Sequence, residues 1–130
     1  MKVDLTKYKD VEVELRFVPT EQGGRRTPVA SGYRPQFYRD GVNFDAVHTY
    51  IGVEQVFPGQ TVRAFLSFIH PDLQVGHLHP GTEFEIREGQ RVVATGYVIR
   101  IVDLEKPCRV DRAKRIHHPI GEFSSMLGAP

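Results

Sequence analysis

Two arginines that follow a glycine pair are the residues best suited to binding a ligand. Arg25 and Arg26 come directly after Gly23 and Gly24, and a run rich in aromatic side chains follows at residues 32–38. Glycine lets the backbone turn where a side chain would clash. Guanidinium groups beside aromatic rings indicate a binding surface. The alternative is an exposed turn whose arginines contact solvent.

Histidines and a single cysteine are the other residues that could do chemistry. His77 and His79 are separated by one residue and His70 lies nearby in the sequence, so their neutral imidazoles could share a zinc or nickel ion. No cysteine is close to them, and no carboxylate is placed with them by spacing. Cys108 has no base placed beside it by any motif. We therefore predict no metal, no cofactor and no enzymatic activity.

Length and composition are those of one soluble globular domain. The chain has 130 residues, of which 40% are hydrophobic and 25% are charged, and this suits a single core without disulfides or metals. Its one cysteine fits a reducing compartment, so a cytoplasmic location is expected. The sequence has no apolar run of about 18 residues and no basic-then-apolar leader. Neither a membrane span nor a secretion signal is predicted.

Charge is distributed unevenly along the chain. Residues 1–104 contain 12 Lys and Arg against 13 Asp and Glu, whereas residues 105–130 contain five against three. Because the first part is nearly neutral, any nucleic-acid surface on it must be a local patch. We expect a β-domain at residues 1–104 and a basic, loosely ordered, flexible C-terminal tail at residues 105–130.

The first half of the chain is predicted to begin with two strands. Residues 11–17 alternate apolar and charged side chains, which is typical of a half-buried strand, and Pro19 ends it. Residues 20–26 read as the turn that follows. Residues 33–39 are extended and aromatic, but Pro35 lacks a backbone donor. The missing donor predicts an edge strand or a strand with a bulge.

Four further strands are expected, at residues 43–51, 61–69, 83–88 and 91–102. Three dipeptides typical of tight turns separate them or precede them: Asp40-Gly41, Pro58-Gly59 and Gly89-Gln90. The second suits a type II turn and the third a type II′ hairpin turn. Residues 61–69 are apolar on both faces, which predicts a central strand covered on two sides. About six short strands indicate an all-β sandwich or a small barrel, whose closure would remove the exposed edges.

Five motifs resemble, in the same order, those of the C-terminal domain of bacterial elongation factor Tu. They are EQGGRRTP (21–28), GYRPQFY (32–38), VEQVFPG (53–59), FIHP (68–71) and FEIREG (84–89). Each motif is short, but together they cover about residues 8–104. The resemblance implies a six-stranded antiparallel closed β-barrel, in agreement with the number of strands expected from the alternation pattern.

The resemblance also implies a setting in translation. In that family the domain is the third of three: it contacts the T-stem backbone of aminoacyl-tRNA, packs on the GTPase domain and offers a docking surface to the nucleotide-exchange factor. This sequence has neither the phosphate-binding loop nor the guanine-reading motif of the GTPase domain. The family's second barrel is missing as well. The resemblance therefore implies a translation-linked, non-enzymatic binding module that binds no nucleotide.

Carried over to this sequence, the family's T-stem contacts fall on Arg25, Arg26, Gln36, His70, Glu88 and Gly89. Arg25 would supply a planar donor fork for phosphate oxygens, and Gln36 could donate to phosphate or to a ribose 2′-hydroxyl. Gly89, which has no side chain, would let the RNA backbone come close to the protein backbone. Asp45 departs from the family, which has a threonine near this position, and an acid there repels phosphate. His70 stands where some members have a lysine, and the loop at residues 72–82 is longer than the family's.

Two kinds of partner follow from these observations. One is tRNA, contacted through the face that carries Arg25, Gln36 and Gly89, and this is the partner we expect. A few phosphate contacts on a nearly neutral body predict weak binding, with Kd roughly 10⁻⁴ to 10⁻⁶ M at physiological salt. The other is a protein of the translation machinery: a GTPase domain in trans, an exchange factor or a toxin. The absence of the other two domains favours this second partner.

Overall fold

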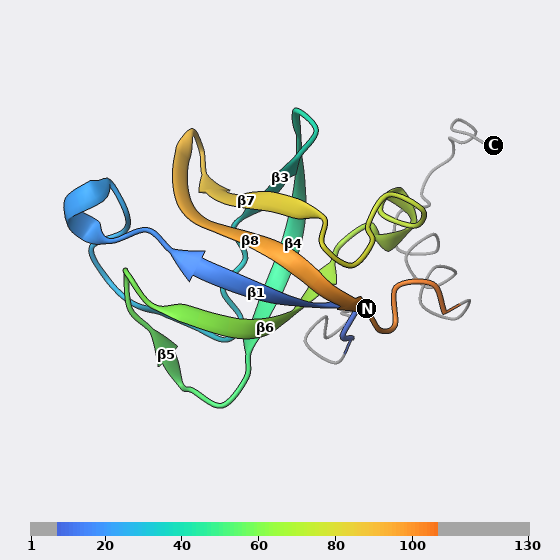
Figure 1. The fold of residues 1–130 in the computed structure, drawn as a ribbon, viewed down its shortest axis with the longest axis horizontal. Helices are drawn as coiled ribbons and strands as arrows, with labels where there is room; N and C mark the ends of the chain where they lie inside the picture. Colours follow the sequence, from blue (N-terminus) through green and yellow to red (C-terminus); the bar gives the residue numbers. More distant parts are fainter. Residues whose placement is uncertain (1–7, 107–130) are drawn as a thin grey trace, which may run out of the picture.

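The computed structural model describes residues 8–106, which form an all-β structure around one closed barrel (Figure 1). Six antiparallel strands follow one another around the barrel in the order β1-β6-β4-β3-β7-β8. Their bounds are Val11–Phe17 (β1), Gln36–Arg39 (β3), Val42–Tyr50 (β4), Thr61–Phe68 (β6), Glu83–Glu88 (β7) and Arg91–Ile101 (β8). The six-stranded antiparallel barrel is thereby confirmed, and the alternative of a sandwich is excluded.

Smaller elements lie in the loops between these strands. They are the paired strands β2 (Val29–Ala30) and β5 (Gln55–Val56) and the 3-10 turns η2 (Thr20–Gln22) and η3 (Pro71–Leu73). In Figure 1, η2 and β5 lie toward one end of the barrel, whereas η3 and both ends of the described chain lie toward the other. The predicted tail at residues 105–130 lies outside the described residues from residue 107 onward.

Alternating side chains of β1 build much of the barrel's core. Val11, Val13 and Leu15 are fully buried and Phe17 is 2% exposed, whereas Arg16 is exposed. The predicted strand and its inward apolar face are therefore confirmed, but the charged face is only partly exposed, since Glu12 is 9% exposed and Glu14 is partly buried. Burying each such apolar side chain stabilises the fold by roughly 1.5–3 kcal/mol. β1 pairs with β6 on one side and with β8 on the other, and its pairing with β8 joins the first and last strands of the barrel.

A buried carboxylate ties three strands together just before β1. Asp10 is fully buried, and its Oδ2 accepts a hydrogen bond from the backbone N–H of Phe68 at 2.8 Å. The backbone N–H of Asp10 donates to the carbonyl of Leu66, and its own carbonyl accepts from the N–H groups of Val102 and Leu104. Asp10 therefore joins the ends of β1, β6 and β8.

Next to Asp10, the two ends of the described chain are hydrogen-bonded to each other. The backbone N–H of Lys9 donates to Oδ2 of Asp103 at 3.2 Å, and the backbone N–H of Asp103 donates to the carbonyl of Lys9 at 2.9 Å. The chain thus enters and leaves the barrel at one place.

The predicted turns are confirmed. Residues 40–41 join β3 to β4 with two positive φ angles, as a type I′ hairpin turn requires. The N–H of Gln60 donates to the carbonyl of Phe57 at 3.1 Å across a turn in which Gly59 has φ 91°, which is the geometry of a type II turn. Gly89, with φ 62°, begins the two-residue hairpin between β7 and β8.

The predicted edge strand at residues 33–39 is wrong in its position. The strand begins at Gln36, directly after Pro35, and lies between β4 and β7 in the closed barrel. The missing donor of Pro35 therefore falls outside the ladder, where it interrupts no strand pairing.

The prediction that residues 61–69 are covered on both faces is wrong for the first half of the strand, although Ser67 on the outer face is 2% exposed. Val62, Ala64 and Leu66 point into the barrel and are buried, but Arg63 on the opposite face is exposed and Phe65 is partly buried. The reason is that a small closed barrel has one packed interior, so the outer face of its strands meets solvent or a covering side chain. At Phe65 the ammonium group of Lys9 lies 5.5 Å from the ring centroid.

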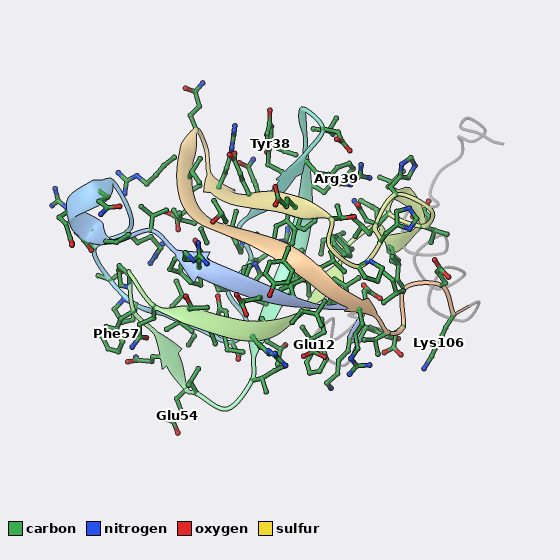
Figure 2. All side chains as sticks on the ribbon, viewed as in Figure 1. Glu12, Tyr38, Arg39, Glu54, Phe57 and Lys106 are labelled. Carbon is green, nitrogen blue, oxygen red and sulfur yellow. The ribbon has the colours of Figure 1, made fainter. Side chains whose placement is uncertain are left out.

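Replacing Asp10 tests how far barrel closure depends on its carboxylate. In Asp10→Ala the backbone N–H of Phe68 loses its acceptor in a buried position, so the free energy of unfolding should fall by about 1–3 kcal/mol. Urea denaturation followed by circular dichroism measures the change. Glu54→Ala is the control, because Glu54 is exposed and points away from the barrel (Figure 2). Equal midpoints for the two variants would contradict the prediction.

Candidate nucleic-acid interface

A tight turn after η2 sets the position of Arg25. Gly23 caps η2 in the left-handed conformation with φ 98°. Gly24 packs so closely on the preceding chain that an added Cβ would lie 2.0 Å from the carbonyl oxygen of Val18. The hydroxyl of Thr20 donates to the carbonyl of Arg25, which closes the turn. The glycine pair therefore does what the sequence predicted, since it allows a turn that side chains would block.

Arg25 is held on several sides. Its Nη1 donates to Oε2 of Glu88 in an ion pair, and its Nε and Nη2 donate to the carbonyl and hydroxyl of Thr27 at 3.3 Å and 3.0 Å. The guanidinium also lies 5.2 Å from the ring centroid of Tyr33. Burial alone would lower the pKa of Arg25, but its hydrogen bond with Glu88 and the charge of that carboxylate raise the pKa above its ordinary value. Arg25 is thus a fixed, permanently charged group.

Tyr33 completes this cluster of Arg25, Tyr33 and Glu88. Its hydroxyl donates to the same Oε2 of Glu88 that accepts from Arg25. Burial and the hydrogen bond to Glu88 raise the pKa of Tyr33 above its ordinary value, so the hydroxyl remains a donor. Glu88 precedes the hairpin turn at Gly89, and the cluster therefore links the loop after β1 to the β7–β8 hairpin.

His48 lies beneath this cluster in the barrel. The rings of Tyr33 and His48 pack edge to face with centroids 5.5 Å apart, and Nδ1 of His48 is 2.9 Å from the hydroxyl of Tyr50, in hydrogen-bond contact. His48 is fully buried, and burial lowers its pKa to about 3. Its Nε2 has no hydrogen-bond partner among the described residues. The histidine is therefore neutral in the folded protein at neutral pH.

Strand pairing places Gln36 between this cluster and the rest of the candidate interface. It lies opposite Arg87, the neighbour of Glu88, on one side and opposite Asp45 on the other. Oε1 of Gln36 is buried and has no hydrogen-bond partner in the described part of the chain. The N–H of residue 69 donates to the carbonyl of Asp45 at 3.1 Å, which brings His70 next to this row.

The structure therefore brings the predicted contact residues into one strip across β7, β3 and β4. Arg25, Glu88 and Gly89 lie at one end of the strip, Gln36 lies in the middle and His70 lies at the other end. Arg26 is exposed on the same turn as Arg25. Whether these residues contact RNA stays a prediction.

The strip is less basic than its residue types suggest. Glu88 compensates the charge of Arg25, and Arg87 is paired with Glu85 at 2.6 Å. Asp45 is exposed within the strip and adds a negative charge there. Such a surface can position a phosphate between fixed donors but offers little long-range attraction to a polyanion.

Sequence reasoning placed the aromatic run that includes Tyr33 beside the arginines but missed Arg87 as part of this surface. The guanidinium of Arg87 stacks 3.5 Å above the ring centroid of Tyr38. The signal was present, because residue 87 and residue 36 both fall inside recognised motifs, but their pairing depends on strand register. Register between strands so far apart in the chain cannot be read from the alternation of either strand alone.

Other candidate chemistry is not supported by the described residues. His77 and His79 are exposed, and within residues 8–106 no three His, Cys, Asp or Glu side chains are grouped so that they could hold a metal ion. Cys108 lies outside the described residues. The same part of the chain contains no helix with the length and hydrophobicity that crossing a lipid bilayer requires.

Comparison with known protein families relates this chain to one of them. Residues 4–102 match the family model described as elongation factor Tu C-terminal domain. The match covers β1 to β8, including the turn at Arg25, the strip through Gln36 and the β7–β8 hairpin.

The burial of neutral His48 should make the protein sensitive to mild acid. The ordinary pKa of histidine is 6.5 and that of folded His48 is about 3, so between these values the unfolded chain takes up a proton that the folded protein does not. This stability is fully present above pH 6.5 and is lost as the pH falls, at up to about 1.4 kcal/mol per pH unit. Urea denaturation between about pH 7 and about pH 5 measures the slope. In His48→Gln the slope should flatten; parallel curves for the two proteins would refute this origin.

Proposed function

Since the chain belongs to the family of elongation factor Tu C-terminal domains, we propose that it is a non-enzymatic binding module that contacts the backbone of the tRNA T stem. Membership of the family relates it to translation factors. The contact with tRNA, the cytoplasmic location that goes with it and the absence of catalysis are parts of the proposal. So is independence from nucleotide, because the sequence has no phosphate-binding loop.

The observation that carries the proposal is the fixed guanidinium of Arg25. Hydrogen bonds to Glu88 and Thr27 and the ring of Tyr33 hold it, yet 23% of its side chain stays exposed. A guanidinium has more N–H groups than these contacts use, so the remaining donors can bind a phosphate oxygen without a loss of side-chain freedom. Pre-organisation of this kind gives geometric selectivity on a surface that is nearly neutral.

Neighbouring groups suit a nucleic-acid backbone with ribose. Gln36 is partly exposed, and a side-chain amide can form hydrogen bonds to phosphate or to a ribose 2′-hydroxyl. Gly89 is exposed at the hairpin turn, where the lack of a side chain permits close approach of a second backbone. These two groups and Arg25 belong to one strip, so a single stretch of backbone could contact all three.

A protein partner is the second candidate, favoured by a separate observation. Three apolar side chains on the segment between β4 and β6 are exposed: Ile51 is 39% exposed, Val53 46% and Phe57 48%. Figure 2 shows Phe57 at the outer edge of this segment, away from the barrel. Exposed apolar side chains of this kind are common at protein-binding surfaces when they form a patch. A GTPase domain in trans, an exchange factor or a toxin would be partners of this kind.

A salt titration of tRNA binding tests the first candidate. If Arg25 contacts phosphate, the slope of log Kd against log salt should decrease by about 1 in Arg25→Ala, with weaker binding at every salt concentration. Arg63→Ala is the matched control, because it removes the same charge from an exposed position on β6. Filter binding or fluorescence anisotropy with unmodified tRNA measures both. The proposal fails if the protein shows no binding to tRNA at low salt.

Removal of the exposed phenylalanine tests the second candidate. If a protein docks on the segment between β4 and β6, Phe57→Ala should release that protein from pull-downs while leaving tRNA binding unchanged. The complex should also survive RNase treatment. A complex that disappears with RNase and persists in Phe57→Ala would count against the protein partner.

A further inference from the structure

An open groove crosses the outer face of the barrel over β3, β7, β8 and β1. These strands are neighbours in the closed sheet, and β7, β8 and β1 lie side by side in Figure 1. The volume of the groove is about 530 Å³. At its middle, β8 contributes two small residues, Thr95 and Gly96, whereas the neighbouring strands contribute glutamates and a tyrosine. The groove is large enough to take several side chains of a docked segment.

Two carboxylates in this groove have no cation beside them. Those of Asp40 and Glu85 are paired with arginines at 3.0 Å and 2.6 Å. Those of Glu14 and Glu83 form no ion pair within residues 8–106. The exposed guanidinium of Arg16 lines the groove as well, but its single charge offsets only one of the two. The groove therefore attracts a cation.

Strand pairing places the ring of Tyr97 between the two unpaired carboxylates. Tyr97 lies opposite Glu14 of β1 on one side and opposite Glu83 of β7 on the other. All three side chains line the groove, and Tyr97 is 41% exposed. Residues opposite each other in antiparallel strands have Cβ atoms about 4.5–5.5 Å apart. Both carboxylates of this Tyr97 row (Glu14, Tyr97 and Glu83) can therefore reach a cation that lies on the ring.

The cluster around Arg25 shows which cation suits such a row. There one guanidinium contacts the ring of Tyr33 and forms an ion pair with the carboxylate of Glu88. The Tyr97 row offers the same kinds of group, a tyrosine ring and carboxylates, but no guanidinium from the described part of the chain lies on its ring. Arginine fits this row better than lysine, because its planar group can stack on the ring and still donate to carboxylates on both sides.

We propose that the basic segment at residues 109–115 of the same chain docks in this groove, with one of its arginines on the Tyr97 row. The segment has the sequence RVDRAKR, with four basic residues and one acidic residue. Its charge is thus complementary to that of the groove. The contact lies within the chain, so the inference holds whether or not the protein binds tRNA.

The length of chain after β8 allows this contact. Lys106 lies nine positions after Tyr97, and Arg115 lies nine positions after Lys106. Equal lengths of chain have the same maximum span, so Arg115 can return to the level of Tyr97. Covalent attachment also keeps the segment at a high local concentration near the groove, which favours it over a separate basic protein.

A spin label placed beside Arg115 tests the docking. The variant Cys108→Ser with Ile116→Cys keeps a single cysteine for a nitroxide label. In the ¹⁵N-labelled full chain at low salt, the amide signals of Thr95 and Tyr97 should lose most of their intensity. The loss should shrink at high salt, because salt screens the ion pairs. No loss at low salt, or a stronger loss at Asp45 than at Tyr97, would overturn the proposal.

Reversing the charge of the groove tests the role of the two carboxylates. Glu14→Lys with Glu83→Lys should abolish the loss of intensity, and adding Arg112→Glu with Arg115→Glu should restore part of it. Glu54→Lys is the matched control, because it makes the same change at an exposed position away from the barrel (Figure 2). If the reversal variant does not fold, Glu14→Gln with Glu83→Gln should still reduce the loss. A loss unchanged without the two carboxylates, or no recovery on reversal of the segment, would refute the pairing.

A mixed sample separates docking within one chain from docking between two copies. It contains the ¹⁵N-labelled chain without the spin label and the spin-labelled chain without ¹⁵N. Undiminished signals of Thr95 and Tyr97 in this mixture, together with their loss in the chain that carries both labels, would support docking within the chain. Loss of the same signals in the mixture would place the segment on the groove of a second copy and would overturn the proposal.

Discussion

Closure of the barrel is the constraint on which the rest of the structure depends. Six short strands have few contacts each, and an open sheet of them would leave two rows of backbone groups unpaired. The pairing of β1 with β8, the first strand with the last, leaves no strand with an unpaired edge. The buried carboxylate of Asp10 stabilises this closure, because it accepts a hydrogen bond from a backbone N–H of β6. Every loop that carries a candidate binding residue is positioned by this closed framework.

The parts of the fold that could be predicted from the sequence are those governed by local rules. Strict alternation located β1 and β7, and glycine-containing dipeptides located the turns. The errors arose where pairing between segments far apart in the chain decides the structure. Pro35 looked like a defect within a strand at residues 33–39, but the strand starts at Gln36, directly after the proline. The outer face of residues 61–69 looked buried throughout because a barrel's single interior cannot be inferred from one strand.

The same distinction holds for the candidate site. The glycine pair and Arg25 were evident from residue type and spacing, and the family resemblance added Gln36, Glu88 and Gly89. The compensation of Arg25 by Glu88 could not be foreseen, because it joins residues 63 positions apart through side-chain geometry. The ion pair fixes the position of the arginine, but the nearby negative charge weakens the electrostatic attraction that the arginine exerts at long range. A surface of this type selects by shape and acts best when other contacts bring its ligand near.

The hydrogen bonds between Lys9 and Asp103 have a consequence for how the barrel could be joined to other proteins. Since the described chain enters and leaves at one point, the barrel has the geometry of an insertable unit: it could be spliced into a surface loop of a host protein without pulling the ends of that loop apart. Segments attached on either side would start as neighbours, at the end of the barrel near η3 and away from η2 and β5 (Figure 1). A cargo fused at either end would therefore sit at a distance from the turn that holds Arg25.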